Sequence, residues 1–131
     1  MDARSVAITV DAPAERVFEY LSNVENLPRW ATEFARELHK RDGRYFVVNG
    51  LGEFLCRLDA DEESGVIDMY AGPSDDELAL FPTRVVPLPG GRSAFTFTMF
   101  RRPEMTEDLF EAQYASLQRE LDNVSEEFAR T

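Results

Sequence analysis

The chain has 131 residues, of which 44% are hydrophobic and 30% are charged, a length and balance that predict a single domain over residues 1–131 with one core. A formal net charge of -11 repels phosphate backbones and anionic membrane surfaces, and no apolar run reaches the ~18 residues of a membrane span. We therefore expect a cytoplasmic protein with no nucleic-acid partner and no membrane insertion.

The first thirty residues predict a strand and two short helices. Residues 4–10 alternate apolar with small or polar side chains, which is the pattern of a half-buried strand. Asp11, followed by a proline and an acidic residue, predicts a helix start in which Asp11 is the capping side chain. This helix should end near residues 22–23, and a second short helical turn, broken by Pro28, is expected at residues 27–30.

Residues 31–41 fit two structures. Their composition favours a helix, but their apolar residues also fit the spacing of a strand. The turn signal at residues 41–44 is followed by a strand-like segment at 45–48, which needs an antiparallel neighbour. We therefore favour a strand, paired through this turn with the segment that follows.

Between residues 52 and 100 the chain reads as several short strands. A loop at 61–64 predicts the register of one hairpin. The expected cross-strand pairs are Leu58 with Ile67, Cys56 with Met69, and Arg57 with Asp68. The first two pairs would form an apolar face, and Arg57 with Asp68 would form an ion pair on the opposite face, worth ~1 kcal/mol at most if exposed. A slip of one residue would instead turn both charges into the interior.

A second hairpin is expected from residues 78–88 and 93–100. Its turn is Pro89-Gly90-Gly91, a sequence that favours a tight reversal of the chain. One face of this hairpin is apolar and consists of Phe81, Val85, Phe95, Phe97 and Met99. Such a face requires a covering element.

The last segment predicts one long helix, because nothing after Pro103-Glu104 breaks it. Its apolar residues recur at intervals of three and four: Phe110, Tyr114, Leu117, Leu121, Val124 and Phe128. The apolar face of the sheet is the surface available to bury this stripe. The sequence thus predicts an α+β protein in which a curved antiparallel sheet wraps around a long C-terminal helix, with two short helices after the first strand.

Several segments carry a family resemblance. Residues 8–18 resemble the opening strand and helix of the START-like superfamily, also called the SRPBCC or Bet v1-like group, and residues 26–30 resemble its "n-x-p-x-W" corner. Residues 82–87 and 95–105 resemble the late strands and helix entry of its small bacterial polyketide cyclase or dehydrase members. The resemblance implies the helix-grip fold and a cavity between sheet and helix.

One position departs from the pattern that the resemblance leads us to expect. The small members are expected to carry Gly-x-x-Asp-His on the central strand, and this chain has Met69 in place of the histidine. The alternation of the strand directs Met69 inward. A thioether therefore replaces an imidazole that would serve as a proton shuttle.

Candidate ligand contacts are aromatic, thioether and uncharged polar side chains on the inner faces. The amide of Gln113 falls on the buried face of the terminal helix, where it requires backbone, water or a ligand as partner, and Thr83 is a second hydrogen-bonding contact. The expected ligand-binding residues are Trp30, Phe34, Met69, Phe81, Thr83, Phe97, Gln113 and Leu117. Plain core packing is the alternative interpretation for the apolar members.

The sequence contains no convincing catalytic constellation. His39 is the single histidine and lies beside two basic residues at a turn, so we expect it to be exposed. The single cysteine, Cys56, excludes an internal disulfide and is expected to be a small core residue. The acidic loops lack the EF-hand spacing, and we expect no metal and no cofactor.

The leading functional hypothesis is the binding of a hydrophobic small molecule, either a polyketide, a lipid or an aromatic metabolite. The alternative is an enzyme of the polyketide cyclase or dehydratase type that works in the same cavity. We expect Leu55 and Phe100 on the other face of the sheet, where these apolar side chains would allow a homodimer to form.

Overall fold

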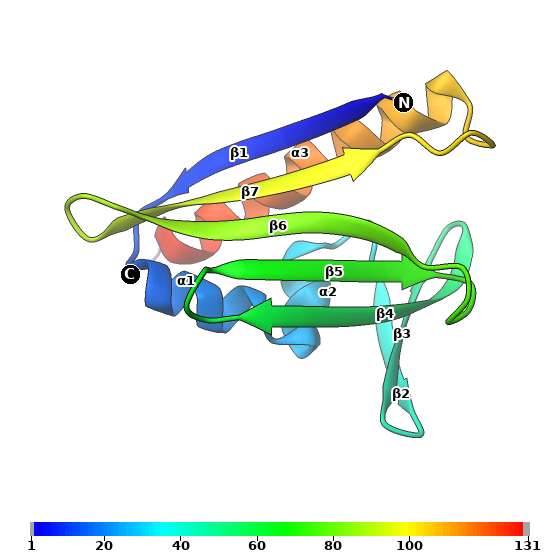
Figure 1. Ribbon diagram of the computed structural model, residues 1–131, viewed down its shortest axis with the longest axis horizontal. Helices are drawn as coiled ribbons and strands as arrows, with labels where there is room; N and C mark the ends of the chain where they lie inside the picture. The colour runs from blue at the N-terminus through cyan, green and yellow to red at the C-terminus, as the bar shows by residue number, and fades with distance from the viewer. Residues whose placement is uncertain (1, 130–131) are drawn as a thin grey trace.

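The computed structural model describes residues 2–129 and has an α+β architecture (Figure 1). The strands are β1 (Ala3–Val10), β2 (Glu37–Arg41), β3 (Arg44–Asn49), β4 (Gly52–Asp61), β5 (Val66–Gly72), β6 (Ala79–Leu88) and β7 (Arg92–Phe100). The helices are α1 (Ala14–Leu21), α2 (Leu27–Trp30) and α3 (Glu107–Ala129), with a short 3-10 helix, η1 (Val24–Asn26), before α2.

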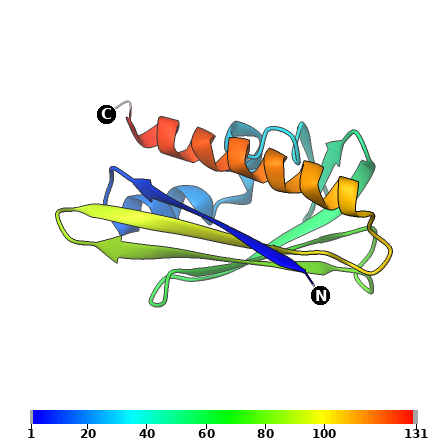
Figure 2. The same ribbon diagram turned by 90° about the horizontal axis from the view of Figure 1, so that it is seen from above.

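The strands form one antiparallel sheet in the order β1-β7-β6-β5-β4-β3-β2. The sheet curves, and α3 lies along its inner face with α1 and α2 on the same side (Figure 2). This is the helix-grip arrangement that the sequence predicts. Among residues 2–129, no helix is both long and apolar enough to cross a bilayer.

The strand predicted within residues 31–41 is shorter than expected. β2 begins at Glu37, and the residues before it form turns without becoming a regular helix. The β2–β3 turn consists of Asp42 and Gly43, with φ values of 52° and 76°. Two consecutive positive φ values give a turn whose twist matches that of the flanking strands. The pairing of β2 with β3 through this turn overrides the helical propensity of residues 37–41.

Two details of the short helices differ from the sequence prediction. The residue at the start of α1 is Pro13, whose carbonyl accepts hydrogen bonds from the backbone of Arg16 and Val17, so the prediction that Asp11 caps this helix is wrong. Pro28 does not break α2, because it lies in the first turn, where its missing N–H is not needed.

The predicted register of the β4–β5 hairpin is also wrong. The observed pairs are Leu58 with Met69, Cys56 with Ala71, Arg57 with Tyr70 and Asp59 with Asp68. The turn comprises residues 62–65, one position later than predicted. Each strand keeps its predicted faces, because every partner has moved by two positions and side chains alternate with a period of two.

Local hydrogen bonds explain the later turn. The Ser64 hydroxyl donates to a carboxylate oxygen of Asp61 at 2.6 Å, and the Gly65 N–H donates to the Asp61 carbonyl at 3.0 Å. Gly65 has a φ of +77°, and a Cβ at this position would lie 2.1 Å from the carbonyl oxygen of Val85. Only a glycine fits such a close approach to β6.

The buried stripe of α3 agrees with the predicted one. Phe110, Leu117, Leu121, Val124 and Phe128 are buried in one hydrophobic core together with inner-face residues of the sheet and residues of α1 and α2. Tyr114 is partly buried and packs against the same core. The opposite side of α3 carries exposed acidic residues, as expected for a helix with one buried face.

Candidate functional site

The apolar residues predicted to contact a ligand come together between the sheet and α3. Trp30, Met69, Phe97 and Leu117 are buried in one core, and Phe34 and Phe81 are partly buried against it. The rings form a connected series: the centroid of Phe95 lies 6.0 Å from that of Trp30 and 6.4 Å from that of Phe97, and Phe97 lies 5.9 Å from Phe81. Met69 points inward, as predicted, in the position where an imidazole was expected.

The two uncharged polar residues of the predicted site differ in their bonding. The Thr83 hydroxyl is buried and donates a hydrogen bond of 2.6 Å to the Ile67 carbonyl, so its proton is already used within the sheet. Gln113 is partly buried on α3, and among residues 2–129 its side chain makes no hydrogen bond within 3.5 Å. Of the two, Gln113 has the free hydrogen-bonding groups.

Trp30 carries a feature that sequence reasoning did not identify. Its side chain is 2% exposed, and its ring meets that of Phe95 edge to face, at an interplanar angle of 90°. Within residues 2–129, the indole nitrogen Nε1 is the one buried side-chain nitrogen or oxygen without a hydrogen-bond partner. Most buried donors in folded proteins have a hydrogen-bond partner, so an unpaired indole nitrogen is unusual.

A buried carboxylate on α3, Glu120, was also missed. It is 5% exposed, and its Oε2 accepts hydrogen bonds from the backbone N–H groups of Glu33 at 3.0 Å and Phe34 at 2.9 Å. Burial raises the pKa of Glu120 to about 7, against the lowering effect of these two bonds. Its position next to Leu121, and three residues after Leu117, was the sequence signal for its burial.

Further side chains hold the same backbone segment. Asn123 on α3 donates to the Trp30 carbonyl at 3.0 Å, and Asn49 on β3 donates to the Phe34 carbonyl at 2.8 Å. We call Glu120, Asn123 and Asn49, with their bonds to residues 30–34, the corner clamp. It fixes the backbone that carries Trp30 and Phe34.

Glu33 continues this network toward the surface. Its carboxylate accepts hydrogen bonds from the Arg119 guanidinium at 2.7 and 2.8 Å and from the Ser116 hydroxyl at 2.8 Å. The bonds with Arg119 are the main reason that the pKa of Glu33 falls to about 2. The two carboxylates of this corner therefore titrate far apart.

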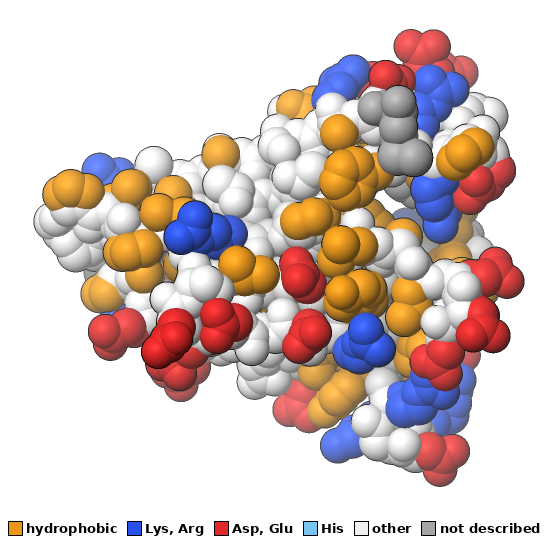
Figure 3. Space-filling view, viewed as in Figure 1, with side chains coloured by type: hydrophobic (Ala, Val, Ile, Leu, Met, Phe, Trp, Pro, Cys, Tyr) orange, Lys and Arg blue, Asp and Glu red, His pale blue; other side chains and the backbone are white. Residues whose placement is uncertain are grey.

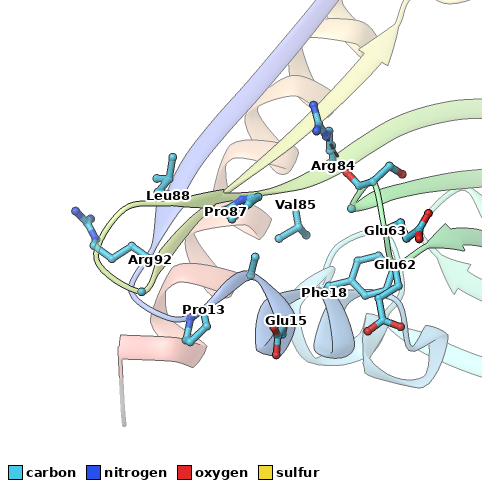
Figure 4. A pocket seen from close by; sticks show the side chains of 14 residues that line it. Pro13, Glu15, Phe18, Glu62, Glu63, Arg84, Val85, Pro87, Leu88 and Arg92 are labelled. Atoms are coloured by element: carbon cyan, nitrogen blue, oxygen red, sulfur yellow. Dashed lines mark hydrogen bonds between the residues drawn. The ribbon is translucent and has the colours of Figure 1, made fainter.

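A cleft of about 470 Å³ lies away from the predicted site, between α1, the β4–β5 turn and the β6–β7 hairpin. Phe18 and Val85 contribute apolar surface to it, and Glu15, Glu62 and Arg92 contribute charges (Figure 4). None of the eight predicted ligand-binding residues lines this cleft.

The charged candidates lie outside the interior. Arg57 is exposed on the outer face of the sheet, and its guanidinium carbon lies 4.5 Å from the centroid of the Tyr70 ring, so the predicted ion pair with Asp68 is wrong. His39 is exposed, as expected. The outer face mixes hydrophobic and charged side chains (Figure 3).

Cys56 is buried in the core, and burial raises the pKa of its thiol to about 12, which removes it as a nucleophile.

These features define the class of the protein: a helix-grip domain with an apolar interior. The chain belongs to the polyketide cyclase / dehydrase and lipid transport family, whose model matches residues 1–129. No curated protein matches the chain.

Solved structures with the same fold have distant sequences. The XoxI protein from Bacillus cereus is 13% identical, with a TM-score of 0.79 and coverage of 99% of this chain and 97% of that one. The Zhui aromatase/cyclase from Streptomyces is 21% identical, with a TM-score of 0.72 and coverage of 98% and 94%. A START superfamily protein from Mycobacterium smegmatis is 18% identical, with a TM-score of 0.63 and coverage of 95% and 97%.

Proposed function

We propose that the protein binds a hydrophobic small molecule, of the polyketide, lipid or aromatic metabolite class, between the sheet and α3. The observation that carries the proposal is the continuous apolar interior, to which the sheet, α2 and α3 all contribute. Apolar interiors with a few polar groups suit flat or elongated guests that are themselves mostly apolar. Membership of a family described as cyclases, dehydrases and lipid transport proteins supports the same function.

Two properties of the interior support the entry of a guest. Met69, Met99 and Met105 belong to the core, and their flexible thioether chains adapt to different neighbours. Phe34 and Phe81 are only partly buried, so the apolar surface continues from the core toward solvent. We infer that a guest enters past these two rings and that the methionine side chains make room for it.

Uptake of 2-acetylnaphthalene, a neutral aromatic ketone, tests this function through matched leucine substitutions. Leu117→Phe adds volume at a buried position facing the sheet, whereas Leu80→Phe adds it at a position that is 38% exposed. We expect saturable binding that Leu117→Phe weakens about fivefold or more, because the added ring occupies the space of the guest. Leu80→Phe should bind as the native protein does. Absence of saturable binding, or equal effects of the two substitutions, would contradict the proposal.

A polyketide cyclase or dehydratase activity is the second candidate, favoured by the family and by the unpaired, partly buried amide of Gln113. Arg57 has no part in it, because this residue lies on the outer face. Turnover of a poly-β-keto substrate should fall in Gln113→Ala if this side chain orients the substrate through hydrogen bonds. Unchanged turnover would remove the one polar group proposed for the reaction.

A homodimer is a separate proposal from the sequence. Leu80 and Phe100 are exposed on the outer face, but Leu55, which was expected to join them, is buried. A solution mass of twice 14.9 kDa would support the dimer, and the mass of one chain would dismiss it. The cytoplasmic location also stays a prediction.

A further inference from the structure

The indole nitrogen of Trp30 is a hydrogen-bond donor with no acceptor among residues 2–129. An indole N–H cannot accept a hydrogen bond, so only an acceptor within hydrogen-bond distance can satisfy it. Leaving a buried donor unpaired is unfavourable, and folded proteins rarely tolerate it without a functional or structural reason.

The surroundings of Trp30 keep this donor in place. Asn123 holds the Trp30 carbonyl at 3.0 Å, and Glu120 holds the N–H groups of residues 33 and 34. The ring of Phe95 lies against the indole edge to face, at 6.0 Å between centroids. The corner clamp thus pairs the neighbouring backbone groups while the indole N–H, in a side chain that is only 2% exposed, stays unpaired.

We propose that the Trp30 N–H donates a hydrogen bond to a carbonyl oxygen of the bound guest and thereby selects neutral apolar carbonyl compounds over hydrocarbons of equal size. This inference rests on the proposed function, since it requires a guest between the sheet and α3. We expect the guest to be neutral because of the residues around Trp30. They form an apolar core that provides no cation to balance an anionic guest.

One property of the sequence makes the test direct: Trp30 is the only tryptophan. A protein labelled with nitrogen-15 therefore gives a single indole N–H resonance, which reports on this donor alone. The probes are 2-acetylnaphthalene and 2-isopropylnaphthalene, which have the same number of non-hydrogen atoms and differ in the carbonyl oxygen. We expect the ketone to move the indole proton strongly downfield, as a new hydrogen bond does, and the hydrocarbon to leave it nearly unchanged.

Substitutions test whether the same hydrogen bond makes the protein prefer the ketone to the hydrocarbon. Trp30→Phe keeps an aromatic ring and removes the donor, so the affinity for the ketone relative to the hydrocarbon should fall about tenfold. Phe81→Leu is the control, because this wall residue has no donor and its change should affect both probes alike. If Trp30→Phe does not fold, the resonance of the native protein still decides.

Three results would overturn the inference. Binding of both probes with equal effects on the indole proton would show that the interior accepts guests without using this donor, and the proposed function would stand. A resonance shifted upfield before any addition and unmoved by the ketone would assign the donor to the face of the Phe95 ring. Failure of both probes to bind would remove the proposed function together with the inference.

Discussion

Single residues at the corner between α2 and β2 connect the long helix to the rest of the molecule. Glu120 lies in the buried stripe of α3, where an apolar residue would be the usual choice, yet its carboxylate holds two backbone N–H groups of the corner. A buried carboxylate is tolerated when hydrogen bonds compensate the loss of water. The identity of this residue is therefore explained by the loop that it binds.

Glu120 also makes stability depend on pH in a defined direction. Its folded-state pKa of about 7 exceeds the ordinary value of 4.5, so the folded protein holds this proton more tightly than the unfolded chain does. Stability should therefore fall as pH rises from 4.5 to 7, by on the order of 3 kcal/mol from this group. Chemical denaturation of the native protein and Glu120→Gln across this range measures the effect, and the difference between them should change with pH.

Glu33 provides the matched control for this measurement. Its pKa is lowered to about 2, so the stability that it contributes is lost only as pH falls below 4.5 toward 2. Between pH 4.5 and 7, the difference between the native protein and Glu33→Gln should change much less than that for Glu120→Gln, because the charge of Glu33 is only a lesser cause of the raised pKa of Glu120. A constant difference for Glu120→Gln in the same range would mean that this carboxylate is not the group that titrates.

At the scale of elements, α3 stabilises the fold mainly by burial. Leu121 is fully buried in the core, whereas Leu109 on the same helix is 37% exposed. We expect Leu121→Ala to reduce the free energy of unfolding by about 2–5 kcal/mol, because it leaves a cavity under the helix. Leu109→Ala removes the same atoms and should cost less than about 1 kcal/mol. Similar losses in urea denaturation would show that α3 does not cover the core as described.

The elements also show what the sequence could predict. Alternation identified the inner side chains Cys56 and Met69 and the outer Arg57, because which face a residue occupies is a local property of a strand. The pairing of those strands depended on the hydrogen bonds of Ser64 and on the fit of Gly65 against β6, which periodicity does not encode. The register was therefore missed while the faces were right.

The candidate site divides in the same way. Helical periodicity placed Leu117 and Gln113 on the side of α3 that faces the sheet, and the aromatic residues of the strands followed from alternation. The partners of Glu120 are 86 and 87 residues away in the sequence, so no local pattern could indicate them. Likewise, the unpaired N–H of Trp30 emerges only when the position of every neighbouring group is known.

At the scale of the whole molecule, the helix-grip fold separates an apolar interior from a strongly acidic surface. A formal charge of -11 repels anionic guests at a distance and so favours neutral ones. The apolar core also favours neutral guests, because it offers no partner for a charge. The cleft beside α1 has charged walls instead, so it suits a different ligand from the apolar core. The location of a bound guest therefore decides between them.

Intermolecular NOEs between bound 2-acetylnaphthalene and the protein's methyl groups test that location most directly. Our account predicts NOEs from the guest to the methyl groups of Met69, Met99 and Leu117, which line the interior. NOEs confined to Leu88, in the cleft beside α1, or to Leu80, on the outer face, would contradict it.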